Sequence, residues 1–376
     1  MALLCEEQNI IRDQARAWVD ENTPVNAFRA VRDEGTGFDD ATWREMVELG
    51  WTGLMVPEAH GGAGLGYMTF GLVLEQLGRN LVASPLLASS LVGVAALLES
   101  ADAGHAQALL PAVAAGTAIV TLAVDEGPRH APERTSLCAA SDGAGFVLTG
   151  GKSAVLEGMA ATHFIVPARG DDAAAGLAGV TLFVVPADAP GITRTTMALM
   201  DGRGYASLQF DGVKLDSSAV LGDPSRGGAV LRATLDRAAA AQSAEMLGSA
   251  SRAFEMTLEY LKTRKQFGQV IGGFQALGHR AAELYSAMEI SRSCAEAALQ
   301  ALDDGADDAD ALCALAKAKV GDFLYLVSNE LIQIHGGIGM TDEFDAGLYL
   351  KRARAQEAAF GNRAFYRNRY AELAGF

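Results

Sequence analysis

The chain has 376 residues, more than one simple hydrophobic core usually supports, so we expect two or three domains. Hydrophobic residues make up 50% of the chain and charged residues 20%, a composition typical of a folded globular protein and not of a disordered one. The formal net charge of −16 argues against a nucleic-acid-binding protein, because such a protein needs a basic surface to meet phosphates.

The N-terminal region predicts a helical domain over residues 1–116. Prolines and a glycine-rich run at residues 61–66 separate apolar segments that have helical spacing. Between Met68 and Arg79, apolar residues recur three and four positions apart, which predicts the buried face of a helix.

From Thr117 the pattern changes to short runs rich in β-branched and aromatic residues, separated by Gly, Pro and Asp. This pattern predicts a middle β domain over residues 117–224. Its strands are expected at residues 119–124, 145–149, 163–166, 180–185 and 206–210.

The remaining residues, 225–376, contain no proline and predict a helical bundle. Its helices are expected at residues 229–265, 274–302, 309–334 and after Thr341. The acidic loop at residues 303–308 lacks the ligand spacing of a calcium loop, so we expect an acidic turn with a helix N-cap. Helices, then strands, then helices give an α+β fold class with three domains.

Several sequence patterns argue against other kinds of site. Four cysteines lie far apart and without metal-ligand spacing, so we expect reduced, mostly buried thiols in a cytoplasmic protein with no metal. They are Cys5, Cys138, Cys294 and Cys313. Glu6 and Glu7 arrive too early for a signal peptide, and the most apolar stretch, residues 85–98, is too short to span a membrane.

Two further patterns point toward phosphate binding only weakly. Gly-Lys-Ser at residues 151–153 would need a glycine five positions earlier, where Phe146 stands, and a following helix to form a phosphate-binding loop. The segment from Lys351 to the C-terminus carries six Lys or Arg against two Glu. Such a segment fits either a phosphate contact or a solvated helix face.

Two C-terminal stretches carry a more specific signal. Residues 259–275 read EYLKTRKQFGQVIGGFQ and residues 333–339 read QIHGGIG. Together they resemble the flavin-diphosphate-binding signature of the acyl-CoA dehydrogenase family, and residues 49–58 and 74–79 are similar to the first domain of that family. The resemblance covers nearly the whole chain. It implies an N-terminal helical domain, a middle β domain, a C-terminal four-helix bundle, FAD as cofactor and an acyl-CoA thioester as substrate.

In that family, the residues of the two stretches reach across a subunit interface to the adenosine-diphosphate half of a neighbour's flavin. The resemblance implies this role for Arg264, Gln266, Phe267, Gln275, Gln333, Gly336 and Gly337. A guanidinium suits phosphate oxygens, carboxamides can donate to phosphate or ribose, and glycines let backbone N–H groups approach an anion. The alternative is a charged helix end and a plain helix stop.

The segments that would hold the flavin ring depart from the family. Members carry a Thr-Glu-Pro-Gly-x-Gly-Ser-like loop, whereas residues 123–129 read AVDEGPR. A second family segment places a Trp and a Thr or Ser against the ring, and here Ala154 and Leu156 stand at those places. The resemblance therefore implies that an aromatic wall and a hydroxyl donor are lost.

The family's catalytic glutamate is also missing from its usual place, where this chain has Phe360. The reaction removes a proton alpha to the thioester while a hydride leaves the beta carbon, so a carboxylate must face the substrate. Relatives that carry the glutamate on the long helix would place it at Ala238 or Ala239. Asp236 and Glu245 are the remaining candidate bases, each with a solvated or ion-paired carboxylate as the alternative.

Three functions stay open at this point. The leading one is a subunit of a heterotetrameric, FAD-dependent acyl-CoA dehydrogenase, acting on a bulky or steroid side-chain acyl group. This chain would complete the FAD site of a second acyl-CoA dehydrogenase-like subunit, which supplies the base, and the Ala-rich helices would form the interface. The alternatives are a homomeric acyl-CoA dehydrogenase with a relocated carboxylate base and a non-catalytic CoA-thioester-binding or structural partner.

Overall fold

The structure of the chain is a computed structural model that describes residues 4–143, 145–170 and 173–376. The chain folds into two compact units. The first unit comprises the chain up to Ala30 together with Tyr67–Val82 and Ala239–Phe376. The second unit comprises Val31–Gly66 and Ala83–Ala238.

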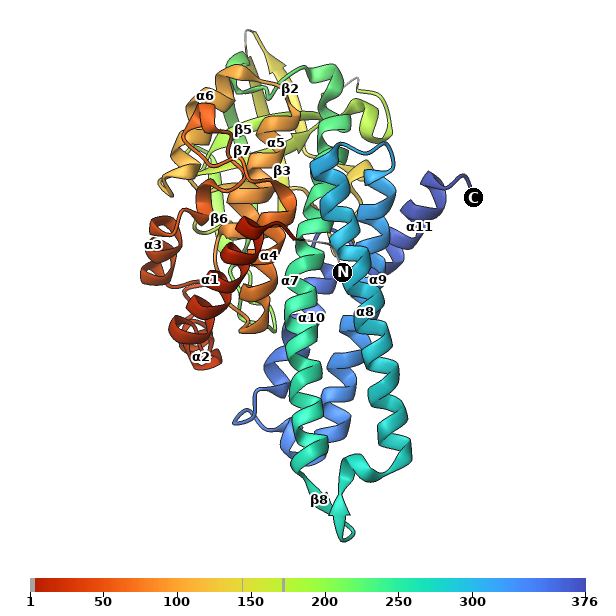
Figure 1. Cartoon of the computed structure of the whole chain (residues 1–376). Coiled ribbons are helices and arrows are strands. Elements are labelled where there is room, and N and C mark those ends of the chain that lie inside the picture. The colour runs from red at the N-terminus through yellow and green to blue at the C-terminus, as the bar shows by residue number, and fades with distance from the viewer. Residues whose placement is uncertain (1–3, 144, 171–172) are drawn as a thin grey trace. The chain divides into compact units, whose positions relative to one another are not determined.

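The first unit is built from helices (Figure 1). They are α1 (Glu6–Asn22), the start of α2 (Val25–Glu34), α4 (Gly66–Arg79), most of α7 (Gly227–Thr263), α8 (Gln275–Asp304), α9 (Ala309–His335), α10 (Ala346–Ala358) and α11 (Arg363–Leu373). The four helices predicted after residue 225 are confirmed with ends shifted by a few residues, and α11 is an additional helix. Glycines end two of them, because Gly305 and Gly336 take positive φ angles of 62° and 61° after α8 and α9.

Helix α4 is buried on nearly all sides, and the predicted inward residues Phe70, Val73, Leu74 and Leu77 are all in the core. The carboxylate of Asp303, at the end of α8, accepts hydrogen bonds from the backbone N–H groups of Tyr67 (2.6 Å) and Met68 (2.8 Å). This carboxylate therefore satisfies two of the N–H groups that the first turn of α4 leaves without an intrahelical partner.

The prediction of an N-cap in the acidic loop was only half right. Asp308 occupies the N-cap position of α9, but its side chain makes no capping hydrogen bond, and its ψ of 10° is not the extended conformation that capping residues favour. Asp303 caps a helix that is distant in sequence, which a local pattern does not reveal.

The second unit holds two sheets. A three-stranded sheet has the order β1-β4-β5, built from β1 (Val120–Leu122), β4 (His163–Ala168) and β5 (Thr181–Pro186). A four-stranded antiparallel sheet has the order β2-β3-β7-β6, built from β2 (Cys138–Asp142), β3 (Gly145–Leu156), β7 (Tyr205–Asp216) and β6 (Ile192–Thr196). All the predicted strands are confirmed, whereas β2 and β6 were not predicted.

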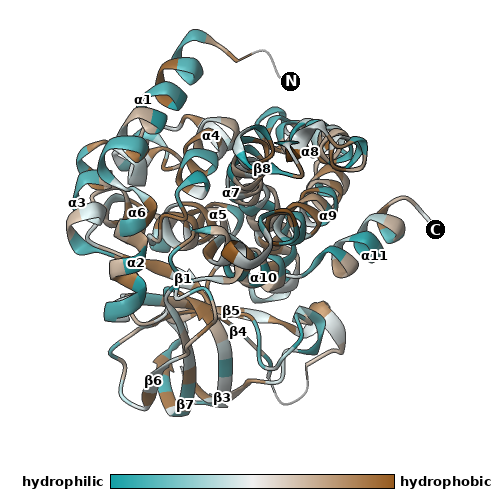
Figure 2. Ribbon diagram, turned by 90° about the horizontal axis from the view of Figure 1, so that it is seen from below, coloured by the Kyte–Doolittle hydropathy of each residue, from teal (hydrophilic) through white to brown (hydrophobic). Residues whose placement is uncertain are grey.

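One hydrophobic core joins the strands of the two sheets. Phe164 of β4, Phe183 of β5 and Phe210 of β7 are fully buried in it, and Phe146 of β3 meets Phe183 edge to face at 5.1 Å. Figure 2 shows the apolar residues that run along β4 and β5. The same unit contains the helices α3 (Asp40–Glu48), α5 (Val94–Glu99) and α6 (Ala103–Ala114) and a π-helical turn at Leu86–Gly93.

The described residues were also compared with the requirements of a membrane span, a metal site and a disulfide. Across the described ranges, no helix combines the length and the apolar character that crossing a bilayer would require. The same ranges contain no group of three or more His, Cys, Asp or Glu side chains that could hold a metal ion. All four cysteines are thiols outside any disulfide, but only Cys313 is buried, so the expectation of mostly buried thiols is wrong.

Candidate cofactor-binding site

The two flavin-signature stretches meet where α7 and α9 end and α8 begins. After α7 the chain forms a two-stranded hairpin, β8 (Lys265–Gln266) and β9 (Gln269–Val270), with Phe267 and Gly268 in its turn (Figure 1). A 3-10 turn, Gly336–Met340, follows α9. These segments pack on a common hydrophobic cluster of Leu261, Ile271 and Ile334, joined by Leu258, Tyr260, Phe274, Leu277 and Ala281.

Aromatic and ionic contacts hold these helix ends in register. The ring of His335, the last residue of α9, stacks on Tyr260 of α7 at 4.1 Å and lies 4.7 Å from the ring of Phe344. Burial lowers the pKa of His335 despite the hydrogen bond between its Nδ1 and the carbonyl oxygen of Leu331, so the ring is neutral near pH 7. Arg280 of α8 pairs with Glu330 of α9 at 2.7 Å. The chain therefore brings the predicted residues together where α7 and α9 end and α8 begins.

The predicted polar residues at this end point into solvent. Arg264, Gln266, Gln275 and Gln333 are exposed, and their side chains make no hydrogen bond or ion pair with any residue that the structure describes. Phe267 is 91% exposed, an unusual position for a large aromatic side chain. A guanidinium, three carboxamides and a flat ring are thus available to a ligand that combines phosphates with an aromatic group.

The glycine pair after α9 leaves its backbone open. Gly336 has φ 61° and ψ −133°, a conformation that glycine adopts readily and that strains other residues. A Cβ atom built on Gly336 or Gly337 would meet nothing within 4 Å, so no side chain of this unit covers them. Backbone N–H groups in such an open turn can approach an anion closely.

In the second unit, the loop at residues 124–130 is occupied by its own contacts. The carboxylate of Glu126 accepts hydrogen bonds from the Ser136 N–H (2.7 Å), the Leu137 N–H (3.0 Å) and the buried Lys152 ammonium (2.6 Å). Burial lowers the pKa of Lys152, and Glu126 opposes that shift. Because Lys152 lies in β3 and is held by Glu126, the Gly-Lys-Ser pattern forms no phosphate-binding loop.

The positions where the family presents its ring-binding side chains are small or buried in this chain. Ala154 has a positive φ of 50° at a β-bulge of β3. Leu156 is buried, and its backbone oxygen accepts a hydrogen bond from the Thr121 hydroxyl. A cavity of about 320 Å³ lies beside the loop at residues 124–130, and all its lining residues fall between Val124 and Ser136. Neither Ala154 nor Leu156 can offer an aromatic face or a hydroxyl to a ring.

The loop that carries Phe360 is closed and tightly held. Phe360 is 7% exposed and has a positive φ of 55°. The Tyr366 hydroxyl donates to its backbone oxygen at 2.7 Å. The buried ammonium of Lys317 donates to the backbone oxygens of Gln356 and Ala359, both at 3.1 Å, and to the side-chain oxygen of Gln242.

Lys317 places a cation at the C-terminal end of α10, where the carbonyl groups lack helical partners. Burial lowers the pKa of Lys317 to about 7, while Glu245 and Glu357 act in the opposite direction. The sequence analysis missed Lys317 and Gln242. The available signal was a lysine that falls on the apolar face of α9, beside Ala314, Ala318 and Val320.

The two candidate bases on α7 are both buried. Asp236 is 1% exposed and lies in the second unit, whereas Glu245 is 2% exposed and lies in the first. A solvated carboxylate is therefore ruled out for both, whereas the ion-paired alternative stays open. Glu245 acts electrostatically on Lys317, which gives this carboxylate a structural role in the bundle.

The basic C-terminal segment is largely neutralised by acidic residues of the same unit. Arg367 lies 2.6 Å from the carboxylate of Asp322, and Arg369 lies 3.8 Å from that of Asp310. Arg352 is fully buried against the ring of Phe28. Ion pairs or burial within the unit therefore engage these three arginines, and the exposed Lys351 and Arg367 keep the solvated-face alternative open.

Comparison with known protein families matches most of the chain to one family. Residues 5–117 match the N-terminal domain of acyl-CoA dehydrogenases, residues 126–213 the middle domain, and residues 225–374 the C-terminal domain.

Among characterised sequences, the chain is 30% identical to acyl-CoA dehydrogenase IpdE2 of Mycolicibacterium smegmatis, over 95% of this chain and 96% of IpdE2. It is also 30% identical to acyl-CoA dehydrogenase FadE27 of Mycobacterium tuberculosis, over 86% of this chain and 85% of FadE27.

Two solved structures are similar in both fold and sequence. The ChsE4-ChsE5 complex from Mycobacterium tuberculosis contains a chain with a TM-score of 0.90 and 28% identity, each chain covered fully. A variant of the Tcur3481-Tcur3483 steroid ACAD contains a chain with a TM-score of 0.87 and 31% identity, with 98% of each chain covered.

Proposed function

The chain belongs to the acyl-CoA dehydrogenase family, whose members are FAD-dependent oxidoreductases, and on that premise we propose that it works as one subunit of a hetero-oligomeric enzyme. Its domains are residues 1–116, 117–224 and 225–376, and it acts in the cytoplasm. It completes the FAD site of an unlike partner subunit, and the partner supplies the base that removes the alpha proton of an acyl-CoA thioester.

The observation that carries this proposal is the closed loop at residues 359–361. The family resemblance assigns the catalytic glutamate to the position of Phe360, which has no acidic group. Lys317 and Tyr366 hold the backbone of this loop in place, so a neighbouring carboxylate would need the bundle to repack before it could take over the role. The two carboxylates considered on α7 are themselves buried. A base from another subunit is the simpler solution.

The residues at the hairpin end fit the adenosine-diphosphate half of FAD. Arg264 carries the donors that suit a diphosphate, Gln266, Gln275 and Gln333 add uncommitted carboxamides, and Gly336 and Gly337 present open backbone N–H groups. The exposed ring of Phe267 gives a surface on which a planar group can pack. When bound, FAD supplies the acceptor for the hydride that leaves the beta carbon.

The residues of this chain fit the isoalloxazine half of FAD less well than they fit the adenosine-diphosphate half. Glu126 and Lys152 are committed to each other, and Ala154 and Leu156 provide neither an aromatic face nor a hydroxyl. A chain that fits the nucleotide but not the ring suits a contribution to a flavin whose ring lies mainly in a partner. This division supports a subunit that assists catalysis without performing the proton transfer.

The similar solved structures support an unlike partner and a bulky substrate. Two of them are described as assemblies of two differently named proteins, ChsE4 with ChsE5 and Tcur3481 with Tcur3483, and the second is described as a steroid acyl-CoA dehydrogenase. By this likeness, the substrate class is the CoA thioester of a bulky acyl group such as a steroid side chain. The assembly is a heterotetramer.

Substitution at the hairpin tests the proposed trans contact. In the complex co-purified with its partner, Arg264→Ala should reduce flavin content and weaken FAD binding by about tenfold or more, because a charged phosphate contact is lost. Arg44→Ala, at an exposed arginine of α3, is the matched control and should leave flavin content unchanged. Unchanged flavin in Arg264→Ala would instead favour a structural partner that has lost the cofactor.

The homomeric alternative makes a different prediction for α7. If one of its carboxylates were a relocated base, Asp236→Asn or Glu245→Gln would abolish turnover while flavin stayed bound. In the hetero-oligomer, both variants that fold should turn over at a rate close to that of the unaltered complex. Loss of turnover with full flavin in either variant would replace the proposal with the homomeric enzyme.

A further inference from the structure

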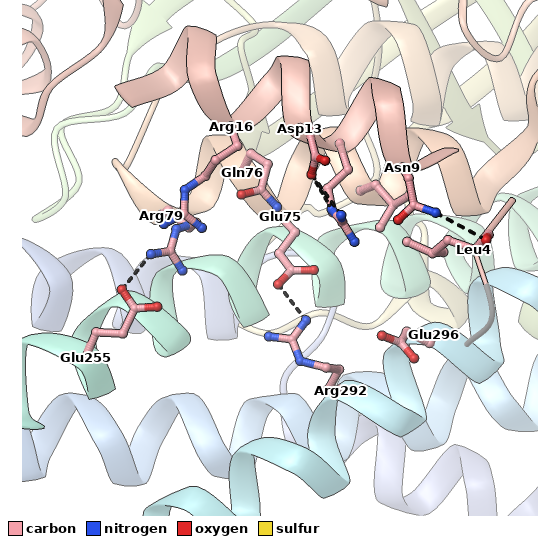
Figure 3. A pocket seen from close by; sticks show the side chains of 12 residues that line it. Leu4, Asn9, Asp13, Arg16, Glu75, Gln76, Arg79, Glu255, Arg292 and Glu296 are labelled. Carbon is pink, nitrogen blue, oxygen red and sulfur yellow. Dashed lines mark hydrogen bonds and ion pairs between the residues drawn. The ribbon is translucent and has the colours of Figure 1, made fainter. Parts of the chain in front are cut away.

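Contacts between the helices of the first unit serve two different purposes. Around a cavity of about 520 Å³, lined by α1, α4, α7 and α8, they are ion pairs within the bundle (Figure 3). Glu75 lies 2.8 Å from Arg292 there, and Arg79 lies 2.5 Å from Glu255. These pairs hold buried helix faces together. At the hairpin end, by contrast, one aromatic contact holds groups that are themselves exposed.

The turn that carries Gly336 and Gly337 is held through His335. A Cβ atom built on either glycine would meet nothing within 4 Å, so the middle of the turn is open. A Cβ atom built on Gly339 would lie 3.0 Å from the Cβ atom of His335, which shows that the chain folds back onto this residue. The ring of Phe344, farther along, lies 4.7 Å from the His335 ring. His335 therefore contacts the turn both where it begins and where it returns.

The same ring also contacts the helix that leads to Arg264. His335 stacks on Tyr260 of α7 with the ring centroids 4.1 Å apart and the ring planes inclined by 28°. The backbone oxygen of Tyr260 accepts a hydrogen bond from the Arg264 N–H at 2.9 Å, one helical turn later. The backbone oxygen of Arg264 in turn accepts from the Ile271 N–H at 2.8 Å, at the base of the hairpin. One imidazole ring thus links the Arg264 backbone to the glycine turn.

A hydrogen bond fixes the orientation of this ring. His335 is 4% exposed, and its Nδ1 atom lies 2.7 Å from the backbone oxygen of Leu331. A carbonyl oxygen can only accept, so Nδ1 carries the proton and donates. The Nε2 atom is buried and has no hydrogen-bond partner in the described part of the chain, which lowers stability. A phenylalanine would fill this space without that cost, so filling space alone does not account for an oriented imidazole here.

We infer that His335 is a positioning residue for the diphosphate of FAD, because its ring sets the spacing between Arg264 and the N–H groups of Gly336 and Gly337. These donors stand on different helix ends, and one diphosphate must meet both. Donors held at the right separation bind more tightly, because less conformational freedom is lost when the ligand arrives. The inference rests on the proposed function, since it concerns the same FAD site. The buried ring acts through its neighbours and does not touch the cofactor.

Titration of the flavin-free complex, co-purified with its partner, with FAD tests this role. His335→Ala should raise the FAD dissociation constant about tenfold, because the two sets of donors lose their fixed spacing. Tyr260→Leu removes the stack from the other helix and should raise it by a similar factor. His335→Phe keeps a stacking ring and should stay within about threefold of the unaltered complex. Turnover per bound flavin at saturating FAD should be unchanged in all three variants.

A control variant separates positioning from general destabilisation. Arg292→Ala breaks the pair with Glu75 between α8 and α4 (Figure 3), in the same unit and away from the hairpin end. It should lower the melting temperature of the chain and leave the FAD dissociation constant unchanged. If lost stability alone weakened FAD binding, Arg292→Ala would weaken it as His335→Ala does.

A double substitution tests whether His335 acts through Arg264. Once the Arg264 guanidinium is gone, its spacing from the glycine turn no longer matters. In the Arg264→Ala background, His335→Ala should therefore weaken FAD binding by less than about threefold, instead of about tenfold. Equal losses with and without Arg264 would mean that the two residues act independently, which contradicts the inference.

Two other results would overturn the positioning role. One is unchanged FAD affinity in Tyr260→Leu and in a folded His335→Ala, and Tyr260→Leu decides alone if His335→Ala does not fold. The other is His335→Phe binding FAD as weakly as His335→Ala, which would exclude the stack as the cause. Arg264→Ala distinguishes the two proposals. If it leaves FAD affinity unchanged, the proposed function itself fails, whereas a loss in Arg264→Ala without one in Tyr260→Leu removes only the role of His335.

Discussion

Two phenylalanines of the first unit share an unusual backbone and lie in opposite environments. Phe267 at the hairpin tip has φ 51° and is 91% exposed, whereas Phe360 after α10 has φ 55° and is 7% exposed. Left-handed conformations are uncommon outside glycine and are kept where the surroundings determine them. At the hairpin, hydrogen-bond donors and an aromatic ring are exposed to solvent, whereas the side chain of Phe360 is buried. This contrast is what the proposed subunit requires.

The largest effect on stability is expected at Lys317, which holds the loop at residues 359–361. Lys317→Met should lower the free energy of unfolding by about 3–5 kcal/mol, because it leaves the side-chain oxygen of Gln242 and the backbone oxygens of Gln356 and Ala359 without their donor. Urea denaturation measures the loss. Lys319→Met, at an exposed lysine of the same helix, is the control and should change stability by less than about 0.5 kcal/mol. Similar losses in both variants would contradict the account of the loop.

The second prediction concerns substitutions of the buried Phe360 itself. Phe360→Glu should destabilise the chain by about 3 kcal/mol, since it places a carboxylate in a buried position shaped for an aromatic ring. Phe360→Leu keeps an apolar side chain and should cost about 1.5 kcal/mol. Thermal denaturation compares the two. Phe360→Glu should also give the lone chain no dehydrogenase turnover, because the ring-side residues are still missing, and turnover in this variant would show that only the glutamate is absent.

The pH dependence of stability sharpens the same contrast. The pKa of Lys317 is lowered from its ordinary value of 10.5 to about 7 in the folded chain, mainly by burial. Between these two values the unfolded chain holds a proton that the folded chain has released, so stability should rise with pH across this window. Below pH 7 both states are protonated and the contribution is constant. Urea midpoints measured against pH should show this rise in the unaltered chain and not in Lys317→Met.

The smallest effect on stability is expected at the open side. Phe267→Ala should change the free energy of unfolding by less than about 0.5 kcal/mol, because the side chain is already in water. In the complex with the partner, the same variant should bind FAD several-fold more weakly. Fluorescence titration with FAD measures this change in the dissociation constant. If the variant destabilised the lone chain and left FAD affinity unchanged, the Phe267 side chain would stabilise the fold and would not contact FAD.

The sequence predicted the regular elements well where local pattern decides them. The long helices follow from alanine-rich segments without proline, and the confirmed strands are rich in β-branched and aromatic residues. Strand β2 was missed because Cys-Ala-Ala-Ser-Asp has little strand preference, and β6 was missed because its short Ile-Thr-Arg-Thr-Thr run lies on a partly exposed edge.

The interior charges could not be predicted in the same way. A lysine in an alanine-rich helix ordinarily points into water, and only the packing of α7, α9 and α10 together buries Lys317 against Gln242. Asp303 likewise meets α4 across more than two hundred positions of sequence. The signature residues at the hairpin were found from the resemblance, and the structure adds that Arg264 and its neighbouring carboxamides are exposed and uncommitted.

The most direct test of the central claim is the visible spectrum and turnover of the purified chain without any partner. An incomplete subunit should carry far less than one flavin per chain and show no acyl-CoA dehydrogenation, while co-expression with its partner restores both. A lone chain that holds one FAD per chain and oxidises an acyl-CoA thioester would contradict the account.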